Sequence, residues 1–253
     1  MVASSSIGEM EPSAAPARVP EGTLVYAIGD SHGCVDRLRA LHEAILEDAD
    51  QSAQARRVAV YLGDYIDRGP DPRGLVALLI EEPLPGFESV HLIGNHEAFL
   101  LRFLADRTVA ALWMMNGGAA TCTSYGVDAA RPPKHAEDDD WLQRELTKCI
   151  PEAHLAFFDA LRPSHIEGDY LFVHAGIRPG VPLDAQDEAD LLWIREPFLS
   201  SAEDFGKVVV HGHTPTDAPV VRANRVGVDT GACYGGPLTA LVLEGGERRF
   251  LQV

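Results

Sequence analysis

Short runs of apolar and β-branched residues recur along the chain, and the first three alternate with longer segments of helical spacing. The runs 24–28, 58–62 and 90–93 predict buried strands, while segments 35–49 and 71–82 carry apolar residues at the spacing of an amphipathic helix. This β-α-β-α-β alternation predicts a parallel sheet covered by helices, and therefore an α/β fold. Four further strands are predicted in the second half of the chain, at 170–173, 208–210, 226–228 and 238–243.

The segment from about 97 to 163 has a mostly helical, irregular pattern, so we expect a helical insertion between two strand-rich halves. Within it, the acidic run 137–140 is interpreted as the first turn of a helix over 141–149 rather than as a metal cluster, because the helix dipole favours acidic residues there. Residues 1–22 are rich in Ser, Ala and Pro and predict a disordered tail. The remainder, 23–253, is expected to be a single domain.

The composition of the chain argues against several classes of binding partner and cellular location. The chain has 253 residues and a formal net charge of −17, which disfavours a nucleic acid polymer or an acidic membrane surface as partner. No apolar stretch approaches the ~20 residues of a spanning helix, and the N-terminus does not have the pattern of a secretory signal. Four scattered cysteines without close pairing fit a reducing cytoplasm. We therefore expect a cytoplasmic protein, and its single domain suggests a monomer.

Polar residues follow five of the predicted strands directly, each time beside glycine. The five loops read GDSHG (29–33), GDYIDRG (63–69), GNHE (94–97), HAG (174–176) and HGHT (211–214). A lone Asp before a helix is usually a cap, and a lone His is usually a core or surface residue. Five such loops in succession favour a functional site, because ligands of open α/β sheets bind outside the carboxyl ends of the strands.

The side chains in these loops share one chemistry, since they offer oxygen and nitrogen donors without a thiolate. Such a set suits Mn²⁺, Fe or Zn²⁺ rather than a Cys-rich structural zinc. Six donors are too many for one catalytic ion with open positions, but they fit two ions that share a bridging carboxylate. The six are Asp30, His32, Asp64, Asn95, His174 and His213.

Motifs of other hydrolases and nucleotide-binding proteins do not occur in the sequence. Cys34 and Cys122 are not followed by the arginine of a cysteine-phosphatase loop, since Ala40 and Asp128 stand at the required spacing. The chain also contains neither a GxxxxGK[ST] phosphate loop nor a Gly-x-Ser-x-Gly nucleophile elbow.

In this order, the five loops resemble those of the calcineurin-like metallophosphoesterases of the phosphoprotein phosphatase family, above all its compact bacterial and phage-type serine/threonine phosphatases. The resemblance spans residues 29 to about 236, and GDYIDRG is its most specific part. It implies an α/β sandwich of two mixed β-sheets flanked by helices, with two divalent metal ions at the strand ends. Mn²⁺ is the first expectation, with Fe or Zn as alternatives.

The resemblance also divides the six donor residues between the two ions. One ion takes Asp30 and His32, the other takes Asn95, His174 and His213, and Asp64 bridges the two. Non-ligand roles are implied as well: His96 is the general acid, Asp67 orients it, and Arg68 grips phosphate oxygens. Arg195 is the candidate second arginine, and Tyr234 is a candidate for lining the pocket beside the metals. His211 is expected to be structural.

The implied reaction is in-line attack on a phosphomonoester by a hydroxide that bridges the two metals. The first expectation for the substrate is a phosphoprotein carrying phosphoserine or phosphothreonine, and Glu97 after GNH favours this class. The alternative is a small phosphate ester, such as the Ap4A cleaved by a bis(5'-nucleosyl)-tetraphosphatase. A non-catalytic scaffold is disfavoured because none of the motif positions is altered. The insertion is expected to wall the cleft, with Trp113 and Tyr125 as packing residues.

Overall fold

Two five-stranded sheets form the centre of the fold in the computed structural model, which describes residues 16–130 and 140–253. The strands are β1 (Thr23–Ile28), β2 (Arg56–Tyr61), β3 (Glu88–His91), β4 (Ser164–Glu167), β5 (Tyr170–Val173), β6 (Val208–His211), β7 (Val220–Val221), β8 (Arg225–Gly227), β9 (Thr239–Glu244) and β10 (Glu247–Gln252). The first sheet has the order β10-β9-β1-β2-β3 and the second has the order β4-β5-β6-β8-β7. Both are mixed, because β1, β2 and β3 run parallel, as do β5, β6 and β8, while the outer pairs are antiparallel.

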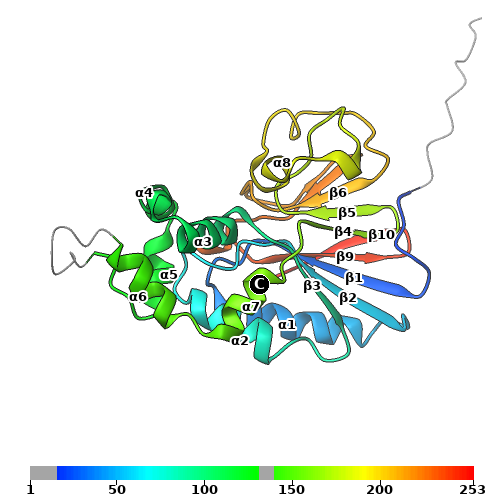
Figure 1. Cartoon of the computed structure of the whole chain (residues 1–253). Coiled ribbons are helices and arrows are strands. Elements are labelled where there is room, and N and C mark those ends of the chain that lie inside the picture. Colours follow the sequence, from blue (N-terminus) through cyan, green and yellow to red (C-terminus); the bar gives the residue numbers. More distant parts are fainter. Residues whose placement is uncertain (1–15, 131–139) are drawn as a thin grey trace, which may run out of the picture.

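Helices cover the outer faces of both sheets (Figure 1). The α-helices are α1 (Val35–Ala49), α2 (Pro72–Glu81), α3 (Asn95–Ala105), α4 (Ala110–Met115), α5 (Gly118–Ser124), α6 (Trp141–Cys149), α7 (Glu152–Asp159) and α8 (Glu188–Trp193), and the 3-10 helices are η1 (Arg107–Val109), η2 (Leu183–Ala185) and η3 (Ala232–Tyr234). In the parts of 97–163 that the structure describes, every regular element is a helix. The part of the acidic run at 137–139 lies outside the described residues, and Asp140 directly precedes α6.

Alternating side chains of β1 divide the core into layers. Leu24, Tyr26 and Ile28 belong to the cluster shared with α1 and α2, whereas Val25 and Ala27 belong to the cluster between the two sheets. A third cluster joins β5 and β6 to α8. Burying each large apolar side chain contributes about 1.5–3 kcal/mol, so a strand with two buried faces is strongly specified. The predicted sandwich of two mixed sheets flanked by helices is confirmed.

The N-terminal part of the fold departs from the expected tail. Residues 1–15 lie outside the described residues, but Val19 is 3% exposed and belongs to the core between the sheets. Its backbone N–H donates to Gly245 O at 3.0 Å, and the Arg18 carbonyl accepts from Asp169 N at 2.9 Å. Part of the segment expected as a tail, around Val19, therefore packs against the core, and a single buried valine inside a polar stretch leaves no periodic signal in the sequence.

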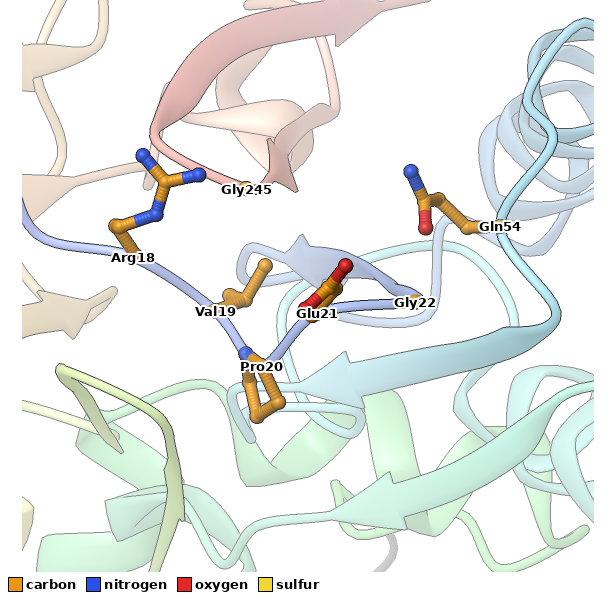
Figure 2. Close-up of a pocket in the computed structure, with 7 residues that line it drawn as sticks. All are labelled: Arg18, Val19, Pro20, Glu21, Gly22, Gln54 and Gly245. Carbon is orange, nitrogen blue, oxygen red and sulfur yellow. The ribbon is translucent and has the colours of Figure 1, made fainter.

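A cavity of about 550 Å³ lies beside this N-terminal segment (Figure 2). It is lined by residues 18–22 together with Gln54 and Gly245. Because it lies where β1 begins, it is at the opposite end of the strand from the loop that carries Asp30 and His32. Among the described residues, no helix is both long and apolar enough to cross a membrane. All four cysteines are free.

Two histidines that are not among the candidate site residues make the fold sensitive to acid. The His42 Nε2 atom lies 2.8 Å from the Tyr61 hydroxyl, and the His91 ring stacks on the Tyr61 ring with centroids 4.8 Å apart. Burial lowers the pKa of each imidazole to about 4. The unfolded chain, with its ordinary histidine pKa of about 6.5, therefore binds protons that the folded protein does not.

We expect the free energy of unfolding to fall as pH drops from about 6.5 towards 4, and to be insensitive to these groups above that range. The variant His91→Phe retains the stacking but removes one titrating group. The free energy of unfolding of this variant should fall by about 1–2 kcal/mol less than that of the wild type between pH 7 and pH 4.5. Urea unfolding of the metal-free protein at both pH values measures this, and identical losses in the two proteins would contradict the prediction.

Candidate metal centre and active site

Loops from both sheets meet at the carboxyl ends of the parallel strands. The first sheet supplies the residues that follow β1 and β2 and those that begin α3 after β3, and the second sheet supplies the residues that follow β5 and β6. All seven side chains brought together here are at most 7% exposed. They are Asp30, His32, Asp64, Asn95, His96, His174 and His213.

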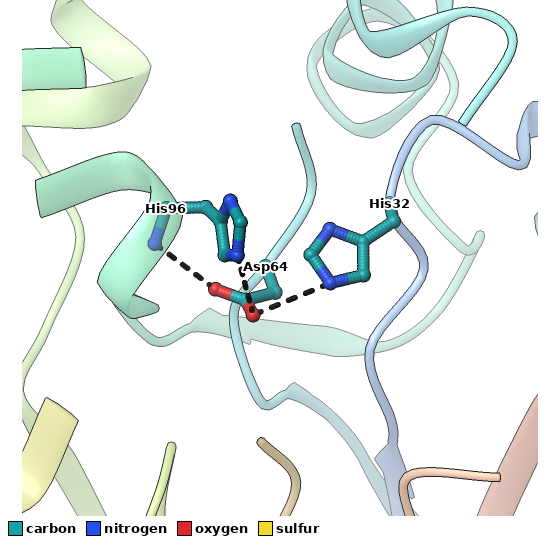
Figure 3. Close-up of side chains that lie close together, drawn as sticks. All are labelled: His32, Asp64 and His96. Atoms are coloured by element: carbon teal, nitrogen blue, oxygen red, sulfur yellow. Dashed lines mark hydrogen bonds and ion pairs between the residues drawn. The ribbon is translucent and has the colours of Figure 1, made fainter. Parts of the chain in front are cut away.

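Asp64 stands at the centre of the site and belongs to two groups of potential metal ligands. In one group its carboxylate lies with His32 and His96, and all three ligand atoms are within 4.8 Å of one another (Figure 3). In the other group it lies with His174 and His213. The His32 Nε2 atom is 3.4 Å from Asp64 Oδ2, and the His174 Nε2 atom is 3.4 Å from Asp64 Oδ1. One carboxylate oxygen therefore faces each group, which is the arrangement that a bridging ligand requires.

Asn95 completes the second group. Its Oδ1 atom lies 2.9 Å from His174 Nε2 and 2.9 Å from His213 Nδ1. Asn95 is the first residue of α3, so the start of this helix places the amide between two loops of the other sheet. The three residues expected at the second ion are thus brought together with Asp64.

Asp30 lies beside these groups rather than inside them. Its Oδ2 atom accepts a hydrogen bond from the His213 backbone N–H at 2.9 Å, while its Oδ1 atom is buried without a hydrogen-bond partner. Burial and the nearby charge of Asp229 raise the pKa of Asp30 well above its ordinary value. In the 4.8 Å group with His32 and Asp64, the third residue is His96.

The protonation of the histidines shows that the donor set fits divalent cations. The His32 Nδ1 atom lies 2.7 Å from Ile66 O and the His174 Nδ1 atom lies 2.8 Å from Leu62 O, so these nitrogens carry the ring protons. Burial lowers the pKa of His32 to about 3 and also lowers that of His174, so both rings are neutral. The His174 Nε2 lone pair faces two further acceptors, Asp64 Oδ1 at 3.4 Å and Asn95 Oδ1 at 2.9 Å, and acceptors lie together in this way favourably around a cation.

Backbone strain is concentrated at the same place. Within residues 16–130 and 140–253, five non-glycine residues have a left-handed φ, which costs of order 1–3 kcal/mol each and persists where the surrounding structure enforces it. Each of the five is a candidate site residue from the strand-end loops. They are His32 (38°), Asp64 (55°), Asp67 (69°), Arg68 (62°) and His213 (65°).

His96 and Asp67 form a buried pair. The His96 Nδ1 atom lies 2.6 Å from Asp67 Oδ2, and both side chains are fully buried. The His96 Nε2 atom has no hydrogen-bond partner and lies 3.9 Å from Asp64 Oδ2. Although burial opposes it, the carboxylates of Asp64 and Asp67 raise the pKa of His96. The ring is therefore arranged to keep a proton on the nitrogen that faces the site.

Two arginines and a tyrosine stand at the rim. The Arg68 Nη1 atom lies 2.7 Å from His32 Nε2, and the Arg68 guanidinium lies 5.7 Å from the centre of the Tyr234 ring. Tyr234 is 64% exposed. The Arg195 Nη2 atom contacts His213 O at 3.5 Å. The two arginines thus contact His32 and His213, and Tyr234 lies beside Arg68.

Glu97 has a role that the sequence analysis missed. Its Oε2 atom accepts from the backbone N–H groups of Asp64 and Gly94, each at 2.9 Å, and its Oε1 atom accepts from Tyr65 N at 2.8 Å. The side chain is fully buried. Glu97 therefore ties the Asp64 loop to the start of α3, and its contacts are with backbone groups. The spacing of a capping box, with Glu at the third helical position, is the signal that could have revealed it.

Two hollows flank the site. One of about 400 Å³ is lined by Ala98, Phe99, Arg102, Leu112, Asn116 and Trp193. The Trp193 ring meets the His213 ring edge to face, with centroids 6.0 Å apart. The other hollow, of about 300 Å³, has Pro215, Asp217 and Tyr234 in its lining. Each hollow is therefore lined by an exposed aromatic ring, Trp193 in the first and Tyr234 in the second.

Comparisons with known proteins agree with this geometry. Residues 23–240 match the family described as Calcineurin-like phosphoesterase. A serine/threonine-protein phosphatase 1 from Salmonella typhimurium is 30% identical over 230 residues, which cover 85% of this chain and 89% of the relative. A bis(5'-nucleosyl)-tetraphosphatase PrpE from Bacillus mycoides is 26% identical over 234 residues, covering 85% and 88%. The crystal structure of a candidate diadenosine tetraphosphatase shares the fold, with a TM-score of 0.61, 24% identity, and coverage of 93% of this chain and 98% of that one.

Proposed function

The chain belongs to the calcineurin-like phosphoesterase family of metal-dependent hydrolases, and we propose that within this family it is a serine/threonine protein phosphatase. The observation that carries the proposal is the Asp67–His96 pair beside Asp64, because an alkoxide leaving group needs a proton donor at this position. The similarity to the Salmonella phosphatase supports the same substrate class. The enzyme is proposed to act as a monomer in the cytoplasm.

Two divalent ions are the proposed cofactors, Mn²⁺ first and Fe or Zn as alternatives, since the donors are imidazoles, carboxylates and an amide. When bound, such ions polarise phosphoryl oxygens and lower the pKa of bound water. The proposed ligands are the six that the sequence motifs contain: Asp30, His32, Asp64, Asn95, His174 and His213. The unpartnered Oδ1 atom of Asp30 is the acceptor assigned to the ion beside His32.

The protein groups around the phosphate have separate tasks in this proposal. Arg68 and Arg195 bind the phosphate oxygens, and they provide local positive charge in a chain whose net charge is −17. The His96 Nε2–H donates its proton to the oxygen of the leaving serine or threonine as its bond to phosphorus breaks. Asp67 holds the ring through Nδ1–H, so that this proton stays aimed at the leaving group. Water adds to phosphorus in line, and the products are the free hydroxyl and inorganic phosphate.

Hydrolysis of a dinucleoside polyphosphate is the second candidate. The similarity to a relative named bis(5'-nucleosyl)-tetraphosphatase favours it, and so does the 40% exposed Trp193 at one hollow, whose ring could stack on a base. The candidates differ in what fills that hollow, either the residues that flank a phosphorylated side chain or an adenine.

A paired assay tests the proposal. Metal-stripped enzyme reloaded with Mn²⁺ is given a phosphothreonine peptide and, separately, Ap4A at matched concentrations. We expect kcat/KM for the peptide to exceed that for Ap4A by at least about tenfold, or ~1.4 kcal/mol in transition-state binding. An opposite preference would replace the proposed function with the second candidate. The variant Asp64→Asn, purified in the same way, controls for contaminating phosphatases.

A further inference from the structure

The carboxylate of Asp67 is held by groups from outside the strand-end loops. Its Oδ2 atom accepts a hydrogen bond from Trp113 Nε1–H at 2.9 Å, in addition to the contact with His96. Its Oδ1 atom accepts from the Thr121 hydroxyl at 2.5 Å. The backbone N–H of Asp67, turned by its left-handed φ, donates in return to Thr121 Oγ1 at 2.9 Å. All four side chains are fully buried.

Both donors come from the helical insertion, at positions about 50 residues away in sequence. Trp113 lies on α4 and Thr121 lies on α5. A second link joins the same segments, because Arg68 N donates to Gly117 O at 3.3 Å. Gly117 has a φ of 104°, and a Cβ atom there would lie 2.8 Å from Arg68 Cγ, so the turn between the helices is fitted closely to this loop.

We propose that Trp113 and Thr121 are positioning residues for proton donation, which act on His96 through the carboxylate of Asp67. This inference rests on the proposed role of the Asp67–His96 pair. A carboxylate that is buried with donors on both oxygens has one orientation, whereas the loss of one donor frees it to rotate and leaves it undersatisfied. The His96 ring would then lose its fixed orientation, although no group that touches the substrate has changed.

The structure offers substitutions that delete single hydrogen bonds. Thr121→Val retains the shape of the side chain without its hydroxyl, Thr121→Ser retains the hydroxyl, and Trp113→Phe retains an aromatic ring against Phe103, whose centroid is 4.9 Å away. The exposed Thr123 on α5 provides a matched control as Thr123→Val. The partly buried Trp141, packed against the same core, provides the control Trp141→Phe.

The test compares a phosphothreonine peptide with p-nitrophenyl phosphate, because the activated aryl leaving group departs without a proton donor. We expect Thr121→Val and Trp113→Phe to lower kcat for the peptide about tenfold, with KM unchanged, and to lower kcat for the aryl ester less than about threefold. Thr121→Ser should restore most of the peptide activity. Thr123→Val and Trp141→Phe should behave as wild type with both substrates.

Equal losses with both substrates, or no loss with either, would overturn the inference. Should Trp113→Phe fail to fold, the Val and Ser variants at Thr121 still decide the question. In a His96→Ala background, Thr121→Val should not lower kcat for the peptide any further. A further tenfold loss of kcat in that background would also overturn the inference. If His96→Ala itself does not distinguish the two substrates, the proposed acid fails. If His96→Ala lowers activity on the peptide more than on the aryl ester but Thr121→Val does not, only the positioning role fails.

Discussion

Asp64→Asn is expected to lower kcat/KM by at least about 10³-fold and to remove at least one of the two bound metal ions. The amide has the shape of the carboxylate but not its charge, and both ligand groups of the site share this one side chain. Burial by itself would raise the pKa of Asp64, yet the surrounding histidines, among them the protonated His96, hold it below its ordinary value, so the charge is present at neutral pH. Elemental analysis of the Mn²⁺-loaded protein and steady-state kinetics measure the two effects.

The control for this experiment is Asp159→Asn, at an exposed position at the end of α7. It should leave metal content and kcat/KM unchanged. Retention of both ions by Asp64→Asn, with more than about a tenth of the activity, would show that the two ion positions do not depend on a shared carboxylate.

His96→Ala is expected to lower kcat for a phosphothreonine peptide by ~10²–10⁴-fold, while p-nitrophenyl phosphate loses much less. The peptide's alkoxide must be protonated as it leaves, and the Nε2 atom of His96 is the unpartnered donor that faces the site. Measurement of both substrates and of metal content is essential here. His96 also lies within 4.8 Å of the ligand atoms of His32 and Asp64, so a role as a ligand must be distinguished from a role as an acid.

The two roles give different results. A general acid leaves metal content intact and changes the two substrates unequally. A metal ligand would lose an ion and reduce both activities alike, and that result would contradict the proposed mechanism.

The buried strands were predictable because their residues are apolar on both faces. β1 and β2 each pack against helices on one side and against the second sheet on the other, so a continuous apolar run is their direct consequence. Three strands were missed for the opposite reason. β10 and β4 are edge strands with charged residues, such as Arg248 and Arg249, and β7 has only two residues. Their pairing depends on neighbours distant in sequence, which local pattern does not contain.

The residues of the candidate site also divide into those with a local sequence signal and those without one. Residues in the five loops were found because each follows a strand directly, so a local motif marks its place. Trp113 and Thr121 carry no such mark, since their contact with Asp67 depends on how α4 and α5 pack 46 and 54 residues further along the chain. The interpretation of Trp113 as a packing residue is correct for its ring, which lies against Phe103, but does not account for its N–H.

Because the site is divided between two sheets, bound metal would affect how much folded protein is present in the cell. His174 and His213 follow strands of one sheet, and Asp64 follows a strand of the other. An ion held by all three would therefore cross-link the two sheets. Ions that bind only the assembled state stabilise it by mass action, by about 4 kcal/mol when the free ion is at a thousand times its dissociation constant. Cellular metal supply would then control how much folded protein survives proteolysis, in addition to how much of it is active.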